Sequence, residues 1–443
     1  MNILLVNANT YRQMPLPPVP IGLTYVSNAL KQAGHKVTVL DCMFSDDPPN
    51  ELRAALRECQ ASVVGFSLRN LDSQSMTRPR SFVPDFSDLV AAAREEDVVS
   101  VLGGTAFSTL PQDMLRRTGA DYGIAGQGEV SFVSLLDSIA KGGLDTTIPG
   151  LVWRQDGEIR ANAPSITGYR ALAADWDAVD LRAYTRKMFG VGIVVRTGCQ
   201  FHCSYCDSPT LFGKIPIARD AKEIVEEMRG LVGSRGIREF FLVDPCFNTT
   251  STAKDVLEEI IRADLRVTFC TEMVPATGTY DDELFRLHKR AGGLFFLMGG
   301  DSLSATMLEN YRKPCDLEDI HACADLADKH GVRFGQSLLF GGPGENERTL
   351  KETLGRVARI PFSVPVAEIG IRIMPNTELF ETARREGVVG SASELLDAKF
   401  YVSRDLDLTW ARKAIRETLH RYSYRRLKML PVAVKSFLSR HRA

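Results

Sequence analysis

The stretch CQFHCSYC, residues 199–206, places Cys199, Cys203 and Cys206 within eight residues. It follows the apolar run GIVVRTG (192–198), which predicts a buried strand that leads into a loop. In a β/α barrel, the loops after the strands carry the active site. Three thiolates at this spacing are suited to hold three irons of a [4Fe–4S] cluster and to leave the fourth iron open for a ligand.

A structural zinc site is the alternative interpretation of the same cysteines. Structural zinc sites close four ligands around the metal. The nearest further candidate, His202, is adjacent to Cys203 in the sequence and is poorly placed to join it. The spacing therefore favours the iron–sulfur cluster.

The chain after about residue 190 alternates strand-like runs with helical stretches. Strands are expected at residues 192–196, 239–243, 267–271, 294–298, 334–339 and 368–373. Six such units in succession favour a partial (β/α)6 barrel over a second open sheet.

The cysteine spacing, with an aromatic residue before its last cysteine, resembles the signature of the radical SAM superfamily. Further along, GGDSLS (299–304) resembles the family's fourth-strand segment near the ribose of S-adenosylmethionine (SAM), and LLFGGPGE (338–345) resembles its fifth-strand turn. GIRIMPNT (370–377) is similar to the sixth-strand segment of the cobalamin-linked subgroup. The resemblance implies that the open iron binds SAM and that the enzyme cleaves it reductively.

The resemblance also implies roles for single residues. Cys199, Cys203 and Cys206 would be the iron ligands, and the expected SAM-binding residues are Tyr205, Asp244, Asp301, Ser302 and Gln336. Asp301 stands where the family more usually has Glu.

Two charged residues at the expected barrel mouth are the candidate catalytic residues. Glu272 ends the third strand and Arg372 lies on the sixth, where each can pair with SAM or substrate. A solvated carboxylate and a structural salt bridge are the respective alternatives. Cys246 is expected to be a buried structural residue, and His288, His321 and His330 are expected on helix surfaces.

The first 130 residues or so show a similar alternation of short apolar runs and amphipathic stretches. The runs cover residues 3–6, 36–40, 62–68, 98–102 and 121–125. Five β/α units of this length predict a doubly wound parallel sheet of Rossmann-like type. Ligands bind such sheets at the carboxyl ends of the strands.

These strand ends resemble the cobalamin-binding domain of the B12-dependent radical SAM group. The residues implied to contact cobalamin are Asn9, Ser67, Arg69, Asn70, Gly103, Gly104, Thr105, Gly126, Gln127, Gly128 and Glu129. The glycines let the backbone approach a large flat corrin closely. The loop after the first strand lacks the Asp-x-His-x-x-Gly run that supplies a histidine ligand to cobalt, and the first histidine is His35. Ser67, Arg69 or Asn70 would then contact the lower face.

Four segments follow from these patterns. They are a cobalamin-binding Rossmann-like domain (1–145), a hairpin and linker (146–185), a radical SAM partial barrel (186–390) and a basic helical C-terminal region (391–443). From Arg404 onward, eleven Lys or Arg stand against three Asp or Glu. A helix docked on the barrel is the favoured interpretation of this region, and contact with an anionic membrane is the alternative.

Composition limits the other partners. The formal net charge of −1 argues against a nucleic-acid binder with a broadly basic surface. No secretory signal and no apolar stretch of membrane-spanning length is found in the sequence, so we expect a cytoplasmic location. An external electron donor of the flavodoxin or ferredoxin type is implied, because no flavin or second cluster motif is visible.

The resemblance implies methylation of an unactivated carbon, or of phosphorus, in a small metabolite. This chemistry would consume two SAM per product and yield 5′-deoxyadenosine and S-adenosylhomocysteine. The alternatives are a cyclisation or rearrangement without methyl transfer, and a radical SAM enzyme that has lost cobalamin.

Overall fold

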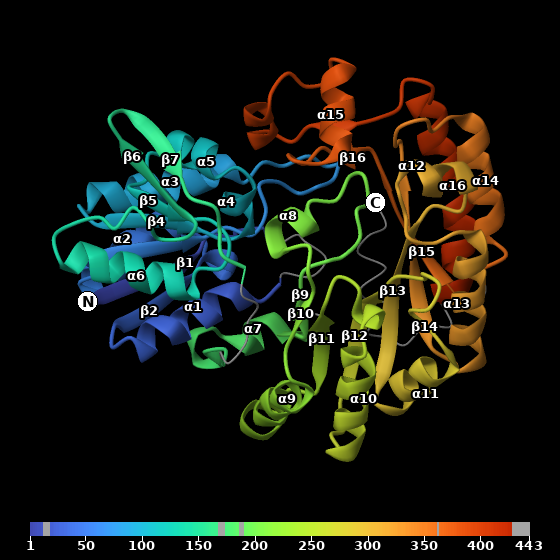
Figure 1. The fold of residues 1–443 in the computed structure, drawn as a ribbon, viewed down its shortest axis with the longest axis horizontal. Helices are drawn as coiled ribbons and strands as arrows, with labels where there is room; N and C mark the ends of the chain where they lie inside the picture. The colour runs from blue at the N-terminus through green and yellow to red at the C-terminus, as the bar shows by residue number, and fades with distance from the viewer. Residues whose placement is uncertain (12–17, 167–172, 186–189, 361–362, 428–443) are drawn as a thin grey trace. The chain divides into compact units, whose positions relative to one another are not determined.

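A computed structural model describes residues 1–11, 18–166, 173–185, 190–360 and 363–427 (Figure 1). The chain divides into two compact units. The first contains residues 1–74, 78–184 and 389–399, and the second contains residues 75–77, 185–388 and 400–443. The expected C-terminal region is thus shared between the units, and Ser393 Oγ donates to Asp113 Oδ1 (2.8 Å) within the first.

The first unit is built on a seven-stranded sheet in the order β2-β1-β3-β4-β5-β6-β7. Its first five strands are parallel, which confirms the Rossmann-like sheet. They are β1 (Asn2–Asn7), β2 (Lys36–Asp41), β3 (Val63–Ser67), β4 (Val99–Gly103) and β5 (Tyr122–Ile124).

A hairpin of β6 (Leu151–Gln155) and β7 (Glu158–Ala161) continues this sheet, because β6 pairs antiparallel with β5. Asp156 and Gly157 form its turn, and both have positive φ as a two-residue hairpin turn requires. The hairpin was expected within a linker, and the structure instead joins it to the first sheet.

Helices cover both faces of the first sheet. α1 (Ile21–Gln32) and α6 (Glu129–Ala140) pack together, and their apolar side chains form a core with residues such as Ile3, Leu5 and Val101. The other helices are α2 (Pro48–Cys59), α3 (Val83–Glu95), α4 (Thr105–Thr109), α5 (Pro111–Thr118) and α7 (Leu181–Thr185). α2 packs against α3, and Phe86 of α3 meets Phe66 of β3 edge to face.

The second unit is built on six parallel strands that follow one another in both sequence and space. They are β8 (Val191–Val194), β11 (Glu239–Val243), β12 (Thr268–Met273), β13 (Gly293–Asp301), β14 (Arg333–Phe340) and β15 (Ser363–Ile369). Because right-handed crossovers always add the next strand on the same side, the connecting helices gather on one face. This is the arrangement of the expected partial barrel.

The helices of this unit line one face of the sheet (Figure 1). They are α9 (Ala221–Arg235), α10 (Thr252–Arg262), α11 (Asp282–Arg290), α13 (Leu317–Lys329), α14 (Glu347–Val357) and α16 (Leu408–Leu427), with the short α8 (Ser208–Phe212), α12 (Ala305–Asn310) and α15 (Glu378–Arg385) in the loops. α16 packs on β15 and α14, and Lys351 Nζ lies 5.4 Å from the centre of the Trp410 ring. The opposite face carries a cluster made of strand residues alone, including Cys270, Phe295 and Val364.

The sixth strand starts earlier than the sequence predicts. It ends at Ile369, before Gly370 (φ +84°), and residues 371–372 form a separate strand β16 (Ile371–Arg372) that pairs with β17 (Phe400–Tyr401). β15 contains Pro365 and lies at the edge of the sheet, where a strand tolerates proline. Arg372 is therefore outside the six-stranded sheet.

His288 is not on a helix surface as expected. Its side chain is fully buried, and its ring meets Phe269 and Phe296 edge to face. Burial lowers the pKa of His288 to about 3, so the ring stays neutral. Within the described residues, no helix has the length and apolar character needed to cross a membrane.

Candidate functional site

A short antiparallel ladder closes the loop that carries the three cysteines. β9 (Arg196–Thr197) pairs with β10 (Ile217–Ala218), so residues 198–216 form a closed excursion. Gly198 opens it with φ +83°, and a Cβ there would lie 2.6 Å from the carbonyl oxygen of Ile215. The N–H of Cys199 donates to the carbonyl of Gly213 (3.0 Å).

Ser204, in the middle of the cysteine motif, ties this loop to two other parts of the second unit. Its N–H donates to the carbonyl of Tyr311 and its Oγ to the carbonyl of Asn310, both at 3.0 Å. Its own carbonyl accepts from the N–H of Leu379 (2.8 Å). The backbone between Cys203 and Cys206 is thus fixed independently of any cofactor.

The surroundings of the three thiols suit a metal cluster. A hydrogen bond from the Cys246 thiol lowers the pKa of Cys199, whereas burial raises the pKa of Cys203 to about 11. Cys203 and Cys206 are half-buried, and thiols with a raised pKa ionise readily only beside a positive centre, which iron would supply. Among the described residues, no three His, Cys, Asp or Glu side chains are gathered closely enough to hold a single metal ion. The loop offers three thiols, and three protein ligands are what a cluster with one open iron needs.

Tyr205 and Asp301 are brought together beneath this loop. The Tyr205 hydroxyl donates to Asp301 Oδ2, and Lys313 Nζ lies 2.7 Å from the same oxygen. Lys313 is almost fully buried, and the pKa of Asp301 is lowered by its charge although burial acts in the opposite direction. The two expected SAM-binding residues thus share a buried ion pair next to the cysteines.

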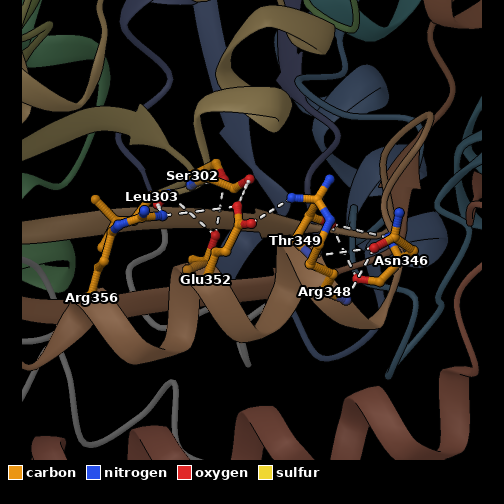
Figure 2. Close-up of polar contacts among 9 residues, drawn as sticks. Ser302, Leu303, Asn346, Arg348, Thr349, Glu352 and Arg356 are labelled. Atoms are coloured by element: carbon orange, nitrogen blue, oxygen red, sulfur yellow. Dashed lines mark hydrogen bonds and ion pairs between the residues drawn. The ribbon is translucent and has the colours of Figure 1, made fainter.

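Ser302 joins a polar network with residues of α14 (Figure 2). Its Oγ lies 3.1 Å from Thr353 Oγ1, and the side chain is 2% exposed. In the same network Ser304 Oγ donates to Glu352 (2.7 Å), and Arg356 donates to the carbonyl of Leu303 (2.7 Å). The geometry gives Ser302 a structural contact with α14.

Asp244 and Gln336 are also engaged within the protein. Asp244 forms a buried bidentate ion pair with Arg196, with Nη2 and Oδ1 at 2.7 Å and Nε and Oδ2 at 3.0 Å. Gln336 is 1% exposed and lies beside Gly300, whose added Cβ would also meet Ile320 of α13. Both side chains are thus engaged within the protein, and Asp244 lies beside Cys246, whose thiol contacts Cys199 of the cysteine loop.

Glu272 and Arg372 occupy different positions. Glu272 shares the face of β12 with Cys270, which packs in the strand-only cluster, so the carboxylate faces the inside of the partial barrel. Arg372 on β16 donates to the carbonyl of Ile373 (2.7 Å). Burial raises the pKa of Asp207, the residue after Cys206, and the charge of Arg372 opposes this rise, so Arg372 lies toward the end of the cysteine loop.

In the first unit, hydrogen bonds connect the ends of four strands, β1 to β4. Asn9 Oδ1 accepts from the backbone N–H of Arg69 (3.1 Å), and Thr105 Oγ1 donates to the carbonyl of Arg69. Asn9 Nδ2 in turn donates to Asn7 Oδ1, and Asn7 donates to Asp41 (2.6 Å). The backbone of Arg69 is thus held from both sides.

A pocket lies at this edge of the sheet. Its lining residues are Asn9, Thr10, Tyr11, Pro18, Met43, Arg69, Asn70 and Phe82. No histidine is among them. The residues expected near cobalamin on β4 and β5, Gly103 to Thr105 and Gly126 to Gly128, are half-buried at the same strand ends. Gly104 has φ +89°, and a Cβ there would clash with the backbone of Leu68. Small residues and close backbone packing fit a flat ligand.

Glu129 begins α6 at the end of the same row. It is 6% exposed, and burial raises its pKa to about 7. A carboxyl group that is half neutral near pH 7 donates as well as accepts hydrogen bonds.

Two residues of the cysteine site were not predicted from the sequence. Lys313 was not among the expected site residues, and Cys246 was expected to be structural. Cys246 Sγ lies 3.9 Å from Cys199 Sγ. Its position directly after Asp244 and Pro245, at the end of a barrel strand, was the only signal in the sequence.

Two family models match the chain. The B12 binding domain matches residues 13–136, and the Radical SAM superfamily matches residues 193–357.

Similar proteins cover most of its length. A tryptophan 2-C-methyltransferase of Streptomyces laurentii is 26% identical over 84% of this chain and 73% of that protein. An anaerobic magnesium-protoporphyrin IX monomethyl ester cyclase of Cereibacter sphaeroides is 24% identical over 75% of this chain and 55% of that protein. The structure of the radical SAM methyltransferase TsrM from Kitasatospora setae, with tryptophan and a SAM analogue bound, is 25% identical, with a TM-score of 0.83 over 95% of this chain and 89% of that one.

Both domains and their order agree with these comparisons, and the cysteine loop lies within the range that the Radical SAM model matches. The chain belongs to the cobalamin-dependent radical SAM family, and its cofactors are a [4Fe–4S] cluster, SAM and cobalamin.

Proposed function

We propose that the protein transfers a methyl group to an unactivated carbon, or to phosphorus, of a small metabolite. The observation that carries this proposal is the similarity to tryptophan 2-C-methyltransferase over 84% of the chain, together with the TsrM fold over 95% of it. These two relatives are methyltransferases, and the TsrM structure contains tryptophan, a small aromatic substrate.

In this proposal, Cys199, Cys203 and Cys206 bind three irons of the cluster. When bound, the cluster and SAM supply one-electron chemistry and cobalamin supplies a carrier for the methyl group. The loop closed by β9 and β10 keeps the three thiols in a fixed arrangement. Lys313, paired with Asp301, places a positive charge behind the loop. The hydrogen bond from Tyr205 to Asp301 anchors this residue of the loop to the pair.

Glu272 and Arg372 are the proposed substrate or SAM contacts. Glu272 faces the inside of the partial barrel, where a carboxylate pairs with a cationic group. Arg372 lies toward the end of the cysteine loop and offers a guanidinium to a carboxylate. Asp244, Ser302 and Gln336 support the site by packing and hydrogen bonds.

In the first unit, the proposed cobalamin contacts lie around the pocket. Arg69 and Asn70 face the corrin where other cobalamin domains have a histidine, and Asn9 orients Arg69 through its backbone. The remaining proposed contacts lie at the neighbouring strand ends. They are Ser67, Gly103, Gly104, Thr105, Gly126, Gln127, Gly128 and Glu129. Arg69 would hold the cofactor through hydrogen bonds, because a guanidinium group has no lone pair to offer to a metal.

Two partners belong to the proposal. An external ferredoxin- or flavodoxin-type protein would supply electrons to the cluster.

The C-terminal helix concerns the second partner, a membrane surface. The packing of α16 on β15 agrees with a helix docked on the barrel. Membrane contact through the basic C-terminus stays a prediction, because residues 428–443 lie outside the described residues.

The test uses anaerobically reconstituted protein loaded with hydroxocobalamin. It is incubated with SAM and titanium(III) citrate, first alone and then with L-tryptophan as the probe substrate. We expect S-adenosylhomocysteine to form and the bound cobalamin to take up a methyl group even without substrate, measured by chromatography and visible absorbance. The magnesium-protoporphyrin cyclase similarity makes a cyclisation the alternative. Cleavage of SAM without any S-adenosylhomocysteine would contradict methyl transfer and favour that alternative.

A further inference from the structure

Cys246 contacts one of the proposed iron ligands although 47 residues separate them in the sequence. Its Sγ lies 3.9 Å from Cys199 Sγ, and each residue is 8% exposed. Both pack in one small apolar cluster with Val274 and Ala276, against which Phe201 also packs. A thiol in such surroundings has few water molecules with which to exchange its hydrogen bond.

The backbone of Cys246 is fixed on both sides. Its N–H donates to Asp244 Oδ1 (2.9 Å), and its carbonyl accepts from Arg196 Nη2 (2.6 Å) and Thr249 Oγ1 (2.9 Å). Arg196 and Asp244 are themselves locked in the buried ion pair. The distance from the Cys246 thiol to Cys199 is thus set by a charged network rather than by loose packing.

We propose that the Cys246 thiol donates an S–H···S hydrogen bond to the Cys199 thiolate when Cys199 binds the cluster, and that this contact raises the reduction potential of the cluster. Reduction adds negative charge, which spreads over the cluster and its thiolates. A hydrogen bond to a ligand sulfur therefore stabilises the reduced form more than the oxidised form. Cys246 is a positioning and tuning residue in this proposal, which rests on the proposed ligation by Cys199, Cys203 and Cys206.

The geometry separates this role from that of a fourth iron ligand. In a [4Fe–4S] cluster each thiolate binds its own iron, so a fourth ligand would bond to iron rather than to the sulfur of Cys199. Cys246 instead touches Cys199 itself. The Phe201 backbone N–H also donates to the Cys199 sulfur, so Cys199 would be the strongly hydrogen-bonded thiolate of the three.

The experiment compares anaerobically reconstituted wild-type protein with Cys246→Ala and Cys246→Ser. The cluster midpoint potential is measured by a redox titration followed by electron paramagnetic resonance, with iron content determined on each sample. We expect Cys246→Ala to lower the ratio of reduced to oxidised cluster about tenfold at a fixed solution potential. For a one-electron couple this corresponds to a midpoint potential lower by ~59 mV. Cys246→Ser keeps an O–H donor and should stay closer to the wild type. Cys270→Ala, which removes another buried thiol on β12, is the matched control and should not shift the potential.

A second measurement needs no variant. In reduced-minus-oxidised infrared difference spectra of the wild-type protein, one cysteine S–H stretching band should change frequency, and it should move on exchange into D2O. Equal midpoint potentials in all four proteins at equal iron content, or the absence of a responsive S–H band, would overturn the proposal. Wild-type protein that binds no cluster would overturn it as well. The readouts do not depend on methyl transfer, so a cluster-loaded protein that fails to methylate still tests the role of Cys246.

Discussion

Arg196 and Asp244 form an ion pair in which both side chains are 1% exposed, and this pair also holds the backbone of Cys246. A charge that loses its partner in such a place keeps its desolvation cost without compensation. The pair is the buried polar centre of the strand ends that carry the cysteine loop.

Replacing Asp244 with Asn should therefore destabilise the protein strongly. We expect the free energy of unfolding of the second unit to fall by about 3–5 kcal/mol, because Arg196 stays buried with a neutral partner. Urea unfolding of the apoprotein measures this change in the free energy of unfolding. Glu381→Gln removes an exposed ion pair with Arg384 and should cost less than about 1 kcal/mol. A loss for Asp244→Asn no larger than this control would show that the pair does not stabilise the fold.

Gly198→Ala should disturb the cysteine loop. The positive φ and the carbonyl of Ile215 at 2.6 Å from a new Cβ both oppose a side chain there. We expect a loss of more than about 1 kcal/mol in stability and a lower iron content after reconstitution. Gly230→Ala, at an open position within α9, should instead be neutral or stabilising by about 0.5–1 kcal/mol. Full iron loading of Gly198→Ala would contradict the expected strain.

Asn9→Ala should weaken cobalamin binding without unfolding the first unit. It removes the acceptor for the Arg69 N–H, and one or two lost hydrogen bonds correspond to about tenfold in the dissociation constant. Titration of the apoprotein with hydroxocobalamin, followed by absorbance, measures this constant. Gln112→Ala, whose side chain donates to Ile159 in the hairpin, serves as the control. Unchanged affinity in Asn9→Ala would remove Asn9 from the proposed site.

Glu129 should make the stability of the apoprotein depend on pH. Its pKa is raised to about 7 in the folded state by burial, from an ordinary value of 4.5. Between these values the folded state holds a proton that the unfolded state has released, so stability should fall as the pH rises from about 4.5 to 7. The full effect is of the order of 3 kcal/mol.

Glu129→Gln isolates this contribution. Glu345 titrates in the same window, because burial also raises its pKa to about 7, so the wild-type profile alone does not identify Glu129. The difference between the urea-unfolding profiles of the wild type and Glu129→Gln should decline over this range. The exposed Glu158→Gln should give a flat difference. A flat difference for Glu129→Gln would indicate an unburied carboxyl group.

The sequence by itself determined the two-domain fold and placed the three cysteines of the proposed cluster site in one loop. Each expected strand of the first unit overlaps an observed one, because alternating apolar runs encode burial locally. The cysteine motif needs no tertiary partner, since its three thiols come from one short loop. The sixth strand was misplaced because its start at Ser363 and its end before Gly370 depend on pairing with β14, which the sequence does not reveal.

Only the tertiary structure decided how polar side chains are partnered. Asp244 is paired with Arg196, 48 residues away, and Ser302 meets Thr353, 51 residues away. The buried position of His288 and the contact between Cys199 and Cys246 likewise depend on residues that are distant in the sequence. A side chain's role depends on which groups the fold brings within hydrogen-bond distance. Local sequence fixes backbone periodicity but not those long-range neighbours.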